Sequence, residues 1–242
     1  MAGGNLRAKD RLIVALDIPD PDEAFGLVEK LDEIVSFFKI GHVLHLQTGL
    51  DFARRLMDLG KKVFLDLKLY DVPETVGRAV SVIADCGISF TTVHGTARNV
   101  VAAIEARGSH DLSLLAVSAL TSWDASDLKE VYGVDMPMEE FVLQRVEHLV
   151  EMGCDGVITS PLEAPAIKNV VPERTIIVTP GIRLEADTTD DHKRHSEPAM
   201  AIRNGADYVV VGRPIIHASD PLQVARDYID AIEQGLKDLV GT

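Results

Sequence analysis

The chain has 242 residues, 46% of them hydrophobic, which is enough for one well-filled core, and α/β barrels of this length are commonly a single domain. The formal net charge is −14 and the basic residues form no block, which argues against nucleic acid as a partner. No apolar run approaches the roughly 18 residues of a membrane span, and the first ten residues lack the hydrophobic region of a signal peptide, so we expect a cytoplasmic protein without a membrane partner.

Short apolar runs rich in β-branched residues recur along the chain and predict strands. They cover Leu12–Leu16, Ser36–Ile40, Lys62–Leu67, Phe90–Val93, Leu114–Ser118, Gly156–Thr159, Ile176–Thr179 and Tyr208–Val211. Segments of helical period separate these runs and predict helices, among them Pro21–Leu31, Thr48–Leu59, Glu74–Cys86, Glu139–Met152 and Pro221–Leu239.

Eight strands that alternate with helices match a parallel (β/α)8 barrel, the TIM barrel of the α/β class. We expect residues 1–10 to form a flexible N-terminal tail and residues 11–242 to form one barrel domain. A doubly wound open sheet is the alternative, but no G-x-G-x-x-G follows the first strand, where Asp17-Ile18-Pro19-Asp20 stands instead. The polar stretch Arg183–Pro198 predicts a mobile loop.

Neither the cysteines nor any motif indicates a bound cofactor. Cys86 and Cys154 stand far apart in apolar segments, and we interpret both as small core residues rather than as a disulfide or a metal site. The chain also lacks a cofactor-binding motif. We therefore expect neither a cofactor nor a metal.

The most informative segment is Asp66-Leu67-Lys68-Leu69-Tyr70-Asp71, which begins inside the third predicted strand. Side chains alternate across a strand, so Phe64, Asp66 and Lys68 should share one face. Two charges on the inner face of a buried strand are costly to desolvate even when they pair. One interpretation is a structural ion pair at the strand end, and the other is a charge array held in a dry, fixed geometry for chemistry.

In such a barrel the chemistry sits at the C-terminal ends of the strands. The polar residues at these ends are Asp17, Lys39, Asp66, Lys68, Asp71, His94, Thr121, Arg183 and Arg213. Three aspartates and two lysines should therefore converge on one mouth, and isolated strand-end ion pairs do not readily explain all five.

A phosphate site is indicated after the last two strands. Gly181 and Gly212-Arg213 follow strands seven and eight, where barrels of this kind often bind phosphate through backbone N–H groups. Glycine lets the backbone approach the anion, and Arg213 adds a bidentate donor. Tight turns alone would explain either glycine, but the pair favours phosphate.

Together these motifs resemble the orotidine 5′-phosphate decarboxylase family over nearly the whole chain. The resemblance is carried by Val14-Ala15-Leu16-Asp17, Phe38-Lys39-Ile40-Gly41, the segment from Asp66 to Val76, Thr92-Val93-His94, Leu120-Thr121-Ser122, Thr179-Pro180-Gly181-Ile182-Arg183 and the run from Gly205 to Ile215. The D-x-K-x-x-D pattern alone is shared with related sugar-phosphate lyases. Its combination, in order, with the first-strand aspartate, P-G-I-R and V-G-R-P-I is highly specific.

The resemblance implies a carboxy-lyase that converts orotidine 5′-phosphate to uridine 5′-phosphate and CO₂ in de novo pyrimidine biosynthesis. It implies that Lys68 donates the proton to C6 of the pyrimidine and that Asp66 lies near the substrate carboxylate. Asp71 and Thr75 would come from the neighbouring subunit of a homodimer with shared active sites. The other implied contacts are those of Asp17 and Lys39 with ribose hydroxyls, Thr121 with the pyrimidine edge, and Arg183, Gly212 and Arg213 with phosphate.

One position departs from the family pattern. The family usually has a phosphate-binding glutamine in an Asp-Gln-x-Arg stretch, and here the stretch is Asp191-His192-Lys193-Arg194. His192 can still donate a hydrogen bond and carries positive charge at lower pH. We therefore treat His192 as a candidate phosphate ligand, the alternative being a solvent-facing loop histidine.

The implied reaction leaves a carbanion at C6 with no ring carbonyl placed to delocalise it, a task for which most decarboxylases recruit a cofactor. Without one, fixed charge must stabilise the anion. Two rival functions share parts of the pattern. A keto-sugar phosphate lyase would use Asp66, Lys68 and Asp71 with a divalent metal, and a non-catalytic nucleotide-phosphate sensor would not require two buried aspartates.

Overall fold

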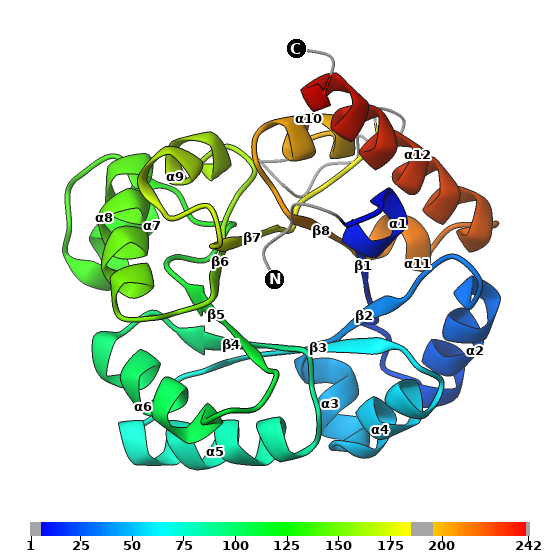
Figure 1. Ribbon diagram of the computed structural model, residues 1–242, viewed down its shortest axis with the longest axis horizontal. Coiled ribbons are helices and arrows are strands. Elements are labelled where there is room, and N and C mark those ends of the chain that lie inside the picture. The colour runs from blue at the N-terminus through cyan, green and yellow to red at the C-terminus, as the bar shows by residue number, and fades with distance from the viewer. Residues whose placement is uncertain (1–5, 185–195, 241–242) are drawn as a thin grey trace.

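The computed structural model describes residues 6–184 and 196–240, and its strands form a closed parallel barrel (Figure 1). The strands are β1 (Leu12–Ala15), β2 (Phe37–Ile40), β3 (Lys62–Leu69), β4 (Phe90–His94), β5 (Ser113–Val117), β6 (Gly156–Ile158), β7 (Ile176–Thr179) and β8 (Tyr208–Val211). They follow one another around the barrel in chain order, and pairing of β1 with β8 closes it. The predicted (β/α)8 barrel is confirmed, and each predicted strand end lies within two residues of the observed one.

Helices surround the strands as an outer ring (Figure 1). Their bounds are α1 (Ala8–Arg11), α2 (Pro21–Leu31), α3 (His42–Thr48), α4 (Asp51–Asp58), α5 (Pro73–Asp85), α6 (Ala97–Arg107), α7 (Ala125–Tyr132), α8 (Met138–Glu151), α9 (Ala164–Val170), α10 (Pro198–Arg203), α11 (Arg213–Ile216) and α12 (Pro221–Val240). None of the described helices is both long and apolar enough to cross a membrane.

Local sequence explains where several helices begin and end. Asp20 caps α2 by accepting hydrogen bonds from the N–H groups of Asp22 and Glu23, and Pro21 fits the first helical position. The predicted helix Thr48–Leu59 is wrong at its start, because Thr48 is the last residue of α3 and α4 begins only at Asp51. Gly49 separates the two helices with a φ of 56°, a conformation that glycine adopts readily.

Two apolar layers hold the barrel. The larger cluster lies between strands and helices and includes Val63 and Leu65, whereas the smaller cluster inside the barrel includes Phe64 of the same strand. The alternation expected for β3 is therefore confirmed from Val63 to Leu65. Phe37, Phe90 and Tyr208, each the first residue of its strand, meet edge to face inside the barrel. This aromatic cluster fills the N-terminal end of the barrel and leaves the C-terminal end for a pocket.

The N-terminal segment and the cysteines add details to the sequence interpretation. Residues 1–5 of the predicted tail lie outside the described residues, and Ala8 to Asp10 belong to α1. Cys86 and Cys154 are both free. Cys154 is buried, its Sγ donates to the carbonyl of Leu114 at 3.0 Å, and burial raises the pKa of its thiol to about 12. Cys154 is a core residue, as predicted.

Candidate active site

A cavity of about 460 Å³ opens at the C-terminal ends of the strands. Its walls combine apolar side chains from inside the barrel, such as Ile158 and Val210, with the polar residues that end the strands. The predicted site residues that line it are Asp17, Lys39, Asp66, Lys68, Thr121, Arg183, Gly212 and Arg213. Residues from β1, β2, β3, β5, β7 and β8 or the loops after them thus meet in one pocket.

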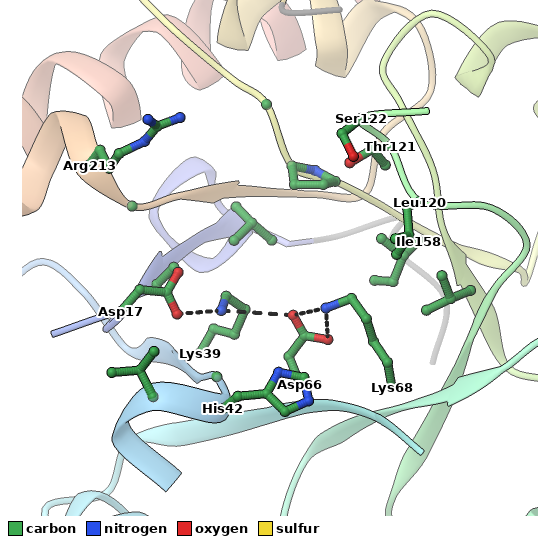
Figure 2. A pocket seen from close by; sticks show the side chains of 18 of the residues that line it. Asp17, Lys39, His42, Asp66, Lys68, Leu120, Thr121, Ser122, Ile158 and Arg213 are labelled. Atoms are coloured by element: carbon green, nitrogen blue, oxygen red, sulfur yellow. Dashed lines mark hydrogen bonds and ion pairs between the residues drawn. The ribbon is translucent and has the colours of Figure 1, made fainter. Parts of the chain in front are cut away.

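The charged residues form a continuous chain of ion pairs across the pocket floor (Figure 2). Lys39 Nζ lies 2.9 Å from Asp17 Oδ1 and 3.7 Å from Asp66 Oδ2. Lys68 Nζ donates to both carboxylate oxygens of Asp66 at 2.9 Å. The alternating signs along Asp17, Lys39, Asp66 and Lys68 compensate part of the cost of burying these charges.

Burial strengthens the interactions between the charges in this row of ion pairs. The side chain of Asp66 is 13% exposed and that of Lys39 is 10% exposed. Burial by itself would raise the pKa of Asp66, but the charges of Lys39 and Lys68, with hydrogen bonds from Lys68 and Thr92, lower that pKa below its usual value. Asp66 is therefore ionised at neutral pH, and its carboxylate pairs directly with the Lys68 ammonium group.

The strand that carries these charges is irregular. β3 pairs with β4 at Leu65–Thr91 and resumes at Leu69–Val93, so residues 66–68 of β3 stand opposite Thr92 alone. Such bulges commonly re-aim side chains beside active sites. Lys68 has a φ of 48° and is the only non-glycine residue with positive φ among those described. The backbone at Lys68 is thus held in a conformation that costs energy for a side chain of this type.

The structure gives a place in the site to residues for which the sequence predicted no role. Thr92 Oγ1 donates to Asp66 Oδ1 and accepts from the backbone N–H of Lys68, both at 2.8 Å. A Cβ at Gly41 would stand 2.6 Å from Asp17 Oδ1 and 3.0 Å from Lys39 Nζ, so only glycine leaves room for that ion pair. His42 also lines the pocket, and its Nε2 lies 3.1 Å from the carbonyl of Leu67.

Two predicted site residues do not line the pocket of their own chain. Asp71 and Thr75 are exposed, next to and within the first turn of α5, and neither belongs to the cavity wall. Asp71 Oδ1 accepts from the N–H of Val72 at 2.6 Å. Of the five charged residues expected at one mouth, four are joined within a single chain and Asp71 lies outside.

The residues after β7 and β8 form another part of the cavity wall. Gly181, with a φ of 77°, and Arg183 follow β7, whereas Gly212 and Arg213 follow β8. In Figure 2, Arg213 lies apart from Lys68 and its side chain is not part of the chain of dashed contacts. His192, the candidate that departs from the family pattern, lies outside the described residues.

The base of the segment after β7 is fixed by hydrogen bonds. The N–H of Arg183 donates to the carbonyl of Ser196 at 3.0 Å, and the N–H of Ser196 donates to the carbonyl of Gly181 at 3.3 Å. Behind them the hydroxyl of Tyr228, from α12, donates to the carbonyl of Ile182 at 3.4 Å and accepts from the N–H of Leu184 at 3.3 Å. Tyr228 is fully buried and thus holds the backbone on both sides of Arg183.

The loop after β5 brings Thr121 and Ser122 to the pocket (Figure 2). Arg145 of α8 fixes the start of this loop, because its guanidinium donates to the carbonyl of Ser118 at 3.0 Å and also to that of Gly95 after β4. His94 ends β4 but does not belong to the cavity wall. Its ring contacts that of Tyr70, and burial, with the charge of Arg145, lowers its pKa, so His94 is neutral at pH 7.

Within residues 6–184 and 196–240, no group of three or more histidine, cysteine, aspartate or glutamate side chains is arranged to hold a metal ion. The acidic residues of the pocket pair with lysines instead. The arrangement offers a half-buried ammonium group beside a buried carboxylate, two hydrogen-bonding side chains on one wall and two arginines on another.

Comparisons with known proteins agree over most of the chain. The family model for the orotidine 5′-phosphate decarboxylase / HUMPS family matches residues 10–228. An orotidine 5′-phosphate decarboxylase of Methylococcus capsulatus is 47% identical over 222 residues, which cover 90% of this chain and 89% of the relative. Another, of Rhodopseudomonas palustris (strain BisA53), is 44% identical over 227 residues, covering 94% and 96%. The crystal structure of orotidine 5′-phosphate decarboxylase from Lactobacillus acidophilus is 34% identical, covers 92% of this chain and 99% of its own, and superposes with a TM-score of 0.80.

Proposed function

The chain belongs to the orotidine 5′-phosphate decarboxylase / HUMPS family, and from this premise we propose how its pocket performs the reaction. The protein is an orotidine 5′-phosphate decarboxylase, a lyase of pyrimidine biosynthesis that releases CO₂ and forms uridine 5′-phosphate. The observation that carries the residue assignments is the ion pair of half-buried Lys68 with buried Asp66 at the end of β3, inside a cavity that is also lined by two arginines.

We propose that the substrate lies across the pocket with its phosphate at the arginine side. Arg183 and Arg213, with the backbone at Gly212, bind the phosphate, because guanidinium groups donate paired hydrogen bonds to such oxyanions. Asp17 and Lys39 bind ribose hydroxyls, and Thr121 hydrogen-bonds the pyrimidine edge. The position of these residues around one cavity supports the assignments. In this orientation C6 of the pyrimidine faces Lys68.

The proposed chemistry uses fixed charge. The bond between C6 and the carboxylate carbon breaks, CO₂ leaves, and the electron pair stays on C6. The Lys68 ammonium group stabilises this developing charge in a largely desolvated site and then transfers a proton to C6. Lys68 is left neutral and regains a proton from water. Asp66 keeps the ammonium group in place at 2.9 Å and lies beside the substrate carboxylate.

We propose that Asp71 and Thr75 act in the active site of a partner subunit. Both are exposed and lie outside their own pocket, and the apolar side chains on either side of Asp71 are also exposed, Tyr70 by 69% and Val72 by 62%. Large exposed apolar residues next to a functional site commonly mark an interface. A homodimer that covers this surface would bring Asp71 to the Lys68 of its partner.

Three further parts of the proposal rest on the sequence. His192 serves as a phosphate donor in place of the family's glutamine. The enzyme works without a cofactor or metal, because the Lys68–Asp66 array supplies the charge that the carbanion requires. It acts in the cytoplasm, and the nucleotide is its small-molecule partner.

The proposal is tested by mixing the purified protein with orotidine 5′-phosphate and following ultraviolet absorbance, with and without excess chelator. We expect the same rate of decarboxylation in both samples. Loss of activity in chelator that a divalent metal restores, together with activity on a keto-sugar phosphate, would contradict the proposal and identify the rival lyase. Binding of the nucleotide without turnover would identify a sensor.

A further inference from the structure

Thr92 is the one residue of β4 that stands opposite the three β3 residues 66–68. A regular parallel ladder would pair these residues with a matching number on the neighbouring strand. Here the backbone N–H of Lys68 lies inside the bulge, outside the regular register with β4, at a residue that is also held at a φ of 48°. A buried N–H group of this kind needs another acceptor.

The hydroxyl of Thr92 supplies that acceptor and also bonds the carboxylate of Asp66. It accepts from the backbone N–H of Lys68 at 2.8 Å and donates its own proton to Asp66 Oδ1 at 2.8 Å. Asp66 Oδ1 also accepts from Lys68 Nζ at 2.9 Å. The three groups therefore form a closed ring in which one hydroxyl contacts both the backbone of the lysine and the carboxylate that holds its ammonium group.

Burial strengthens this ring. Thr92 is fully buried, so water does not compete for its hydroxyl. A hydroxyl can donate one hydrogen bond and accept another at the same time, and the ring requires both. A valine has nearly the same shape but offers neither interaction.

We propose that Thr92 is a positioning residue for the catalytic lysine, which fixes the strained backbone of Lys68 and the orientation of Asp66 so that the ammonium group points at the reacting carbon. The proposal rests on the decarboxylase function stated above. Thr92 touches neither the pocket cavity nor, by this assignment, the substrate. It acts through the two residues that do.

The chain offers a matched control one residue away. Thr91 is also fully buried on β4, and its hydroxyl also donates to β3, to the carbonyl of Leu65 at 2.9 Å. Because side chains alternate along a strand, Thr91 points away from the barrel interior and contacts neither Lys68 nor Asp66. Thr91→Val therefore removes a buried hydroxyl from the same two strands without disturbing the ring.

The experiment compares Thr92→Val, Thr92→Ser and Thr91→Val with the wild-type protein. The kcat for orotidine 5′-phosphate is measured for each and divided by the number of sites that bind uridine 5′-phosphate, so that unfolded protein does not count. We expect Thr92→Val to lose about ten- to a hundredfold in kcat, the loss typical of a hydrogen bond to a charged group. Affinity for uridine 5′-phosphate should change by less than about threefold, because the product lacks the carboxylate beside Asp66.

Thr92→Ser keeps the hydroxyl and should retain kcat within about threefold of the wild type, and Thr91→Val should do the same. A loss in Thr92→Val that is less than about fivefold, or that Thr91→Val matches, would overturn the proposal and leave Thr92 a structural residue. Failure of serine to rescue would overturn it as well. The wild-type rate in the same assay tests the decarboxylase function separately, so the two failures remain distinct.

Discussion

The ammonium group of Lys68 carries two tasks in the proposed reaction, stabilising the carbanion and supplying its proton. Both depend on its position beside Asp66 inside the cavity, 35% exposed to solvent. Neither a cofactor nor a second acid is assigned to these tasks. Removal of one amino group should therefore be sufficient to stop turnover.

We predict that Lys68→Ala abolishes decarboxylation and leaves a folded protein that still binds uridine 5′-phosphate. Steady-state kinetics measure the first property and calorimetric titration the second. Lys62→Ala provides the control, since Lys62 is exposed at the other end of the same strand and should be replaceable. If Lys68→Ala keeps more than about a tenth of the wild-type kcat, a loss of only ~1.4 kcal/mol, Lys68 is not the acid.

At the scale of residues, the charged side chains of the site could be predicted from the sequence. The residues that hold those side chains in place could not. Asp66 and Lys68 are conspicuous because they interrupt an apolar strand. Thr92 is an ordinary strand residue in sequence, and its role depends on a bulge that arises only when β3 and β4 pair. The requirement for glycine at position 41 likewise becomes visible only in the structure, where a Cβ would lie 2.6 Å from Asp17 Oδ1.

At the scale of elements, α12 reaches the phosphate side of the pocket from behind. Figure 1 shows this helix beside α10 and α11, outside the strands. Gly235 allows close packing, because a Cβ there would lie 2.7 Å from the carbonyl of Ala199 in α10. Through Tyr228 the helix also bonds the backbone before and after Arg183. The last helix thus supports an arginine that lies about 45 residues earlier in the chain than Tyr228.

We predict that Tyr228→Phe, which keeps the ring and removes the hydroxyl, weakens binding of uridine 5′-phosphate by about three- to tenfold. Binding of uridine, which lacks the phosphate, should be unchanged. Titration of both ligands measures the difference, and Ile232→Val, a small loss of buried volume on the same helix, is the control. An equal effect on both ligands would indicate general loosening of the fold and contradict a role at Arg183.

Elements were predictable where one physical rule dominates. Strands β7 and β8 are predicted to the residue because strands buried on both faces are continuously apolar. The predicted helix Thr48–Leu59 begins too early, because it starts at the last residue of α3 and runs across Gly49 into α4. The break at Gly49 depends on a positive φ, which a glycine permits but does not require.

At the scale of the whole molecule, the proposed dimer makes each active site a joint product of two chains. Lys68 comes from one chain and Asp71 from the other. Two different inactive variants should then complement each other. A site contained within one chain could not behave in this way.

We predict that mixing Lys68→Ala with Asp71→Asn restores activity once subunits exchange. In a mixed dimer, one site receives Lys68 from the Asp71→Asn chain and Asp71 from the Lys68→Ala chain, and the other site lacks both. Random exchange of equal amounts makes half of the dimers mixed, so about a quarter of all sites should be native. Absence of activity after exchange has been verified by mass spectrometry would exclude a shared site.

The aromatic cluster at the N-terminal end of the barrel also determines how substrate enters the pocket and how products leave it. Phe37, Phe90 and Tyr208 fill that end, so the pocket is a cul-de-sac with its entrance at the strand ends. The reaction splits one molecule into a nucleotide and carbon dioxide. Both products must therefore leave through the same opening by which the substrate entered. With the N-terminal end filled, carbon dioxide leaves by the same opening as the nucleotide.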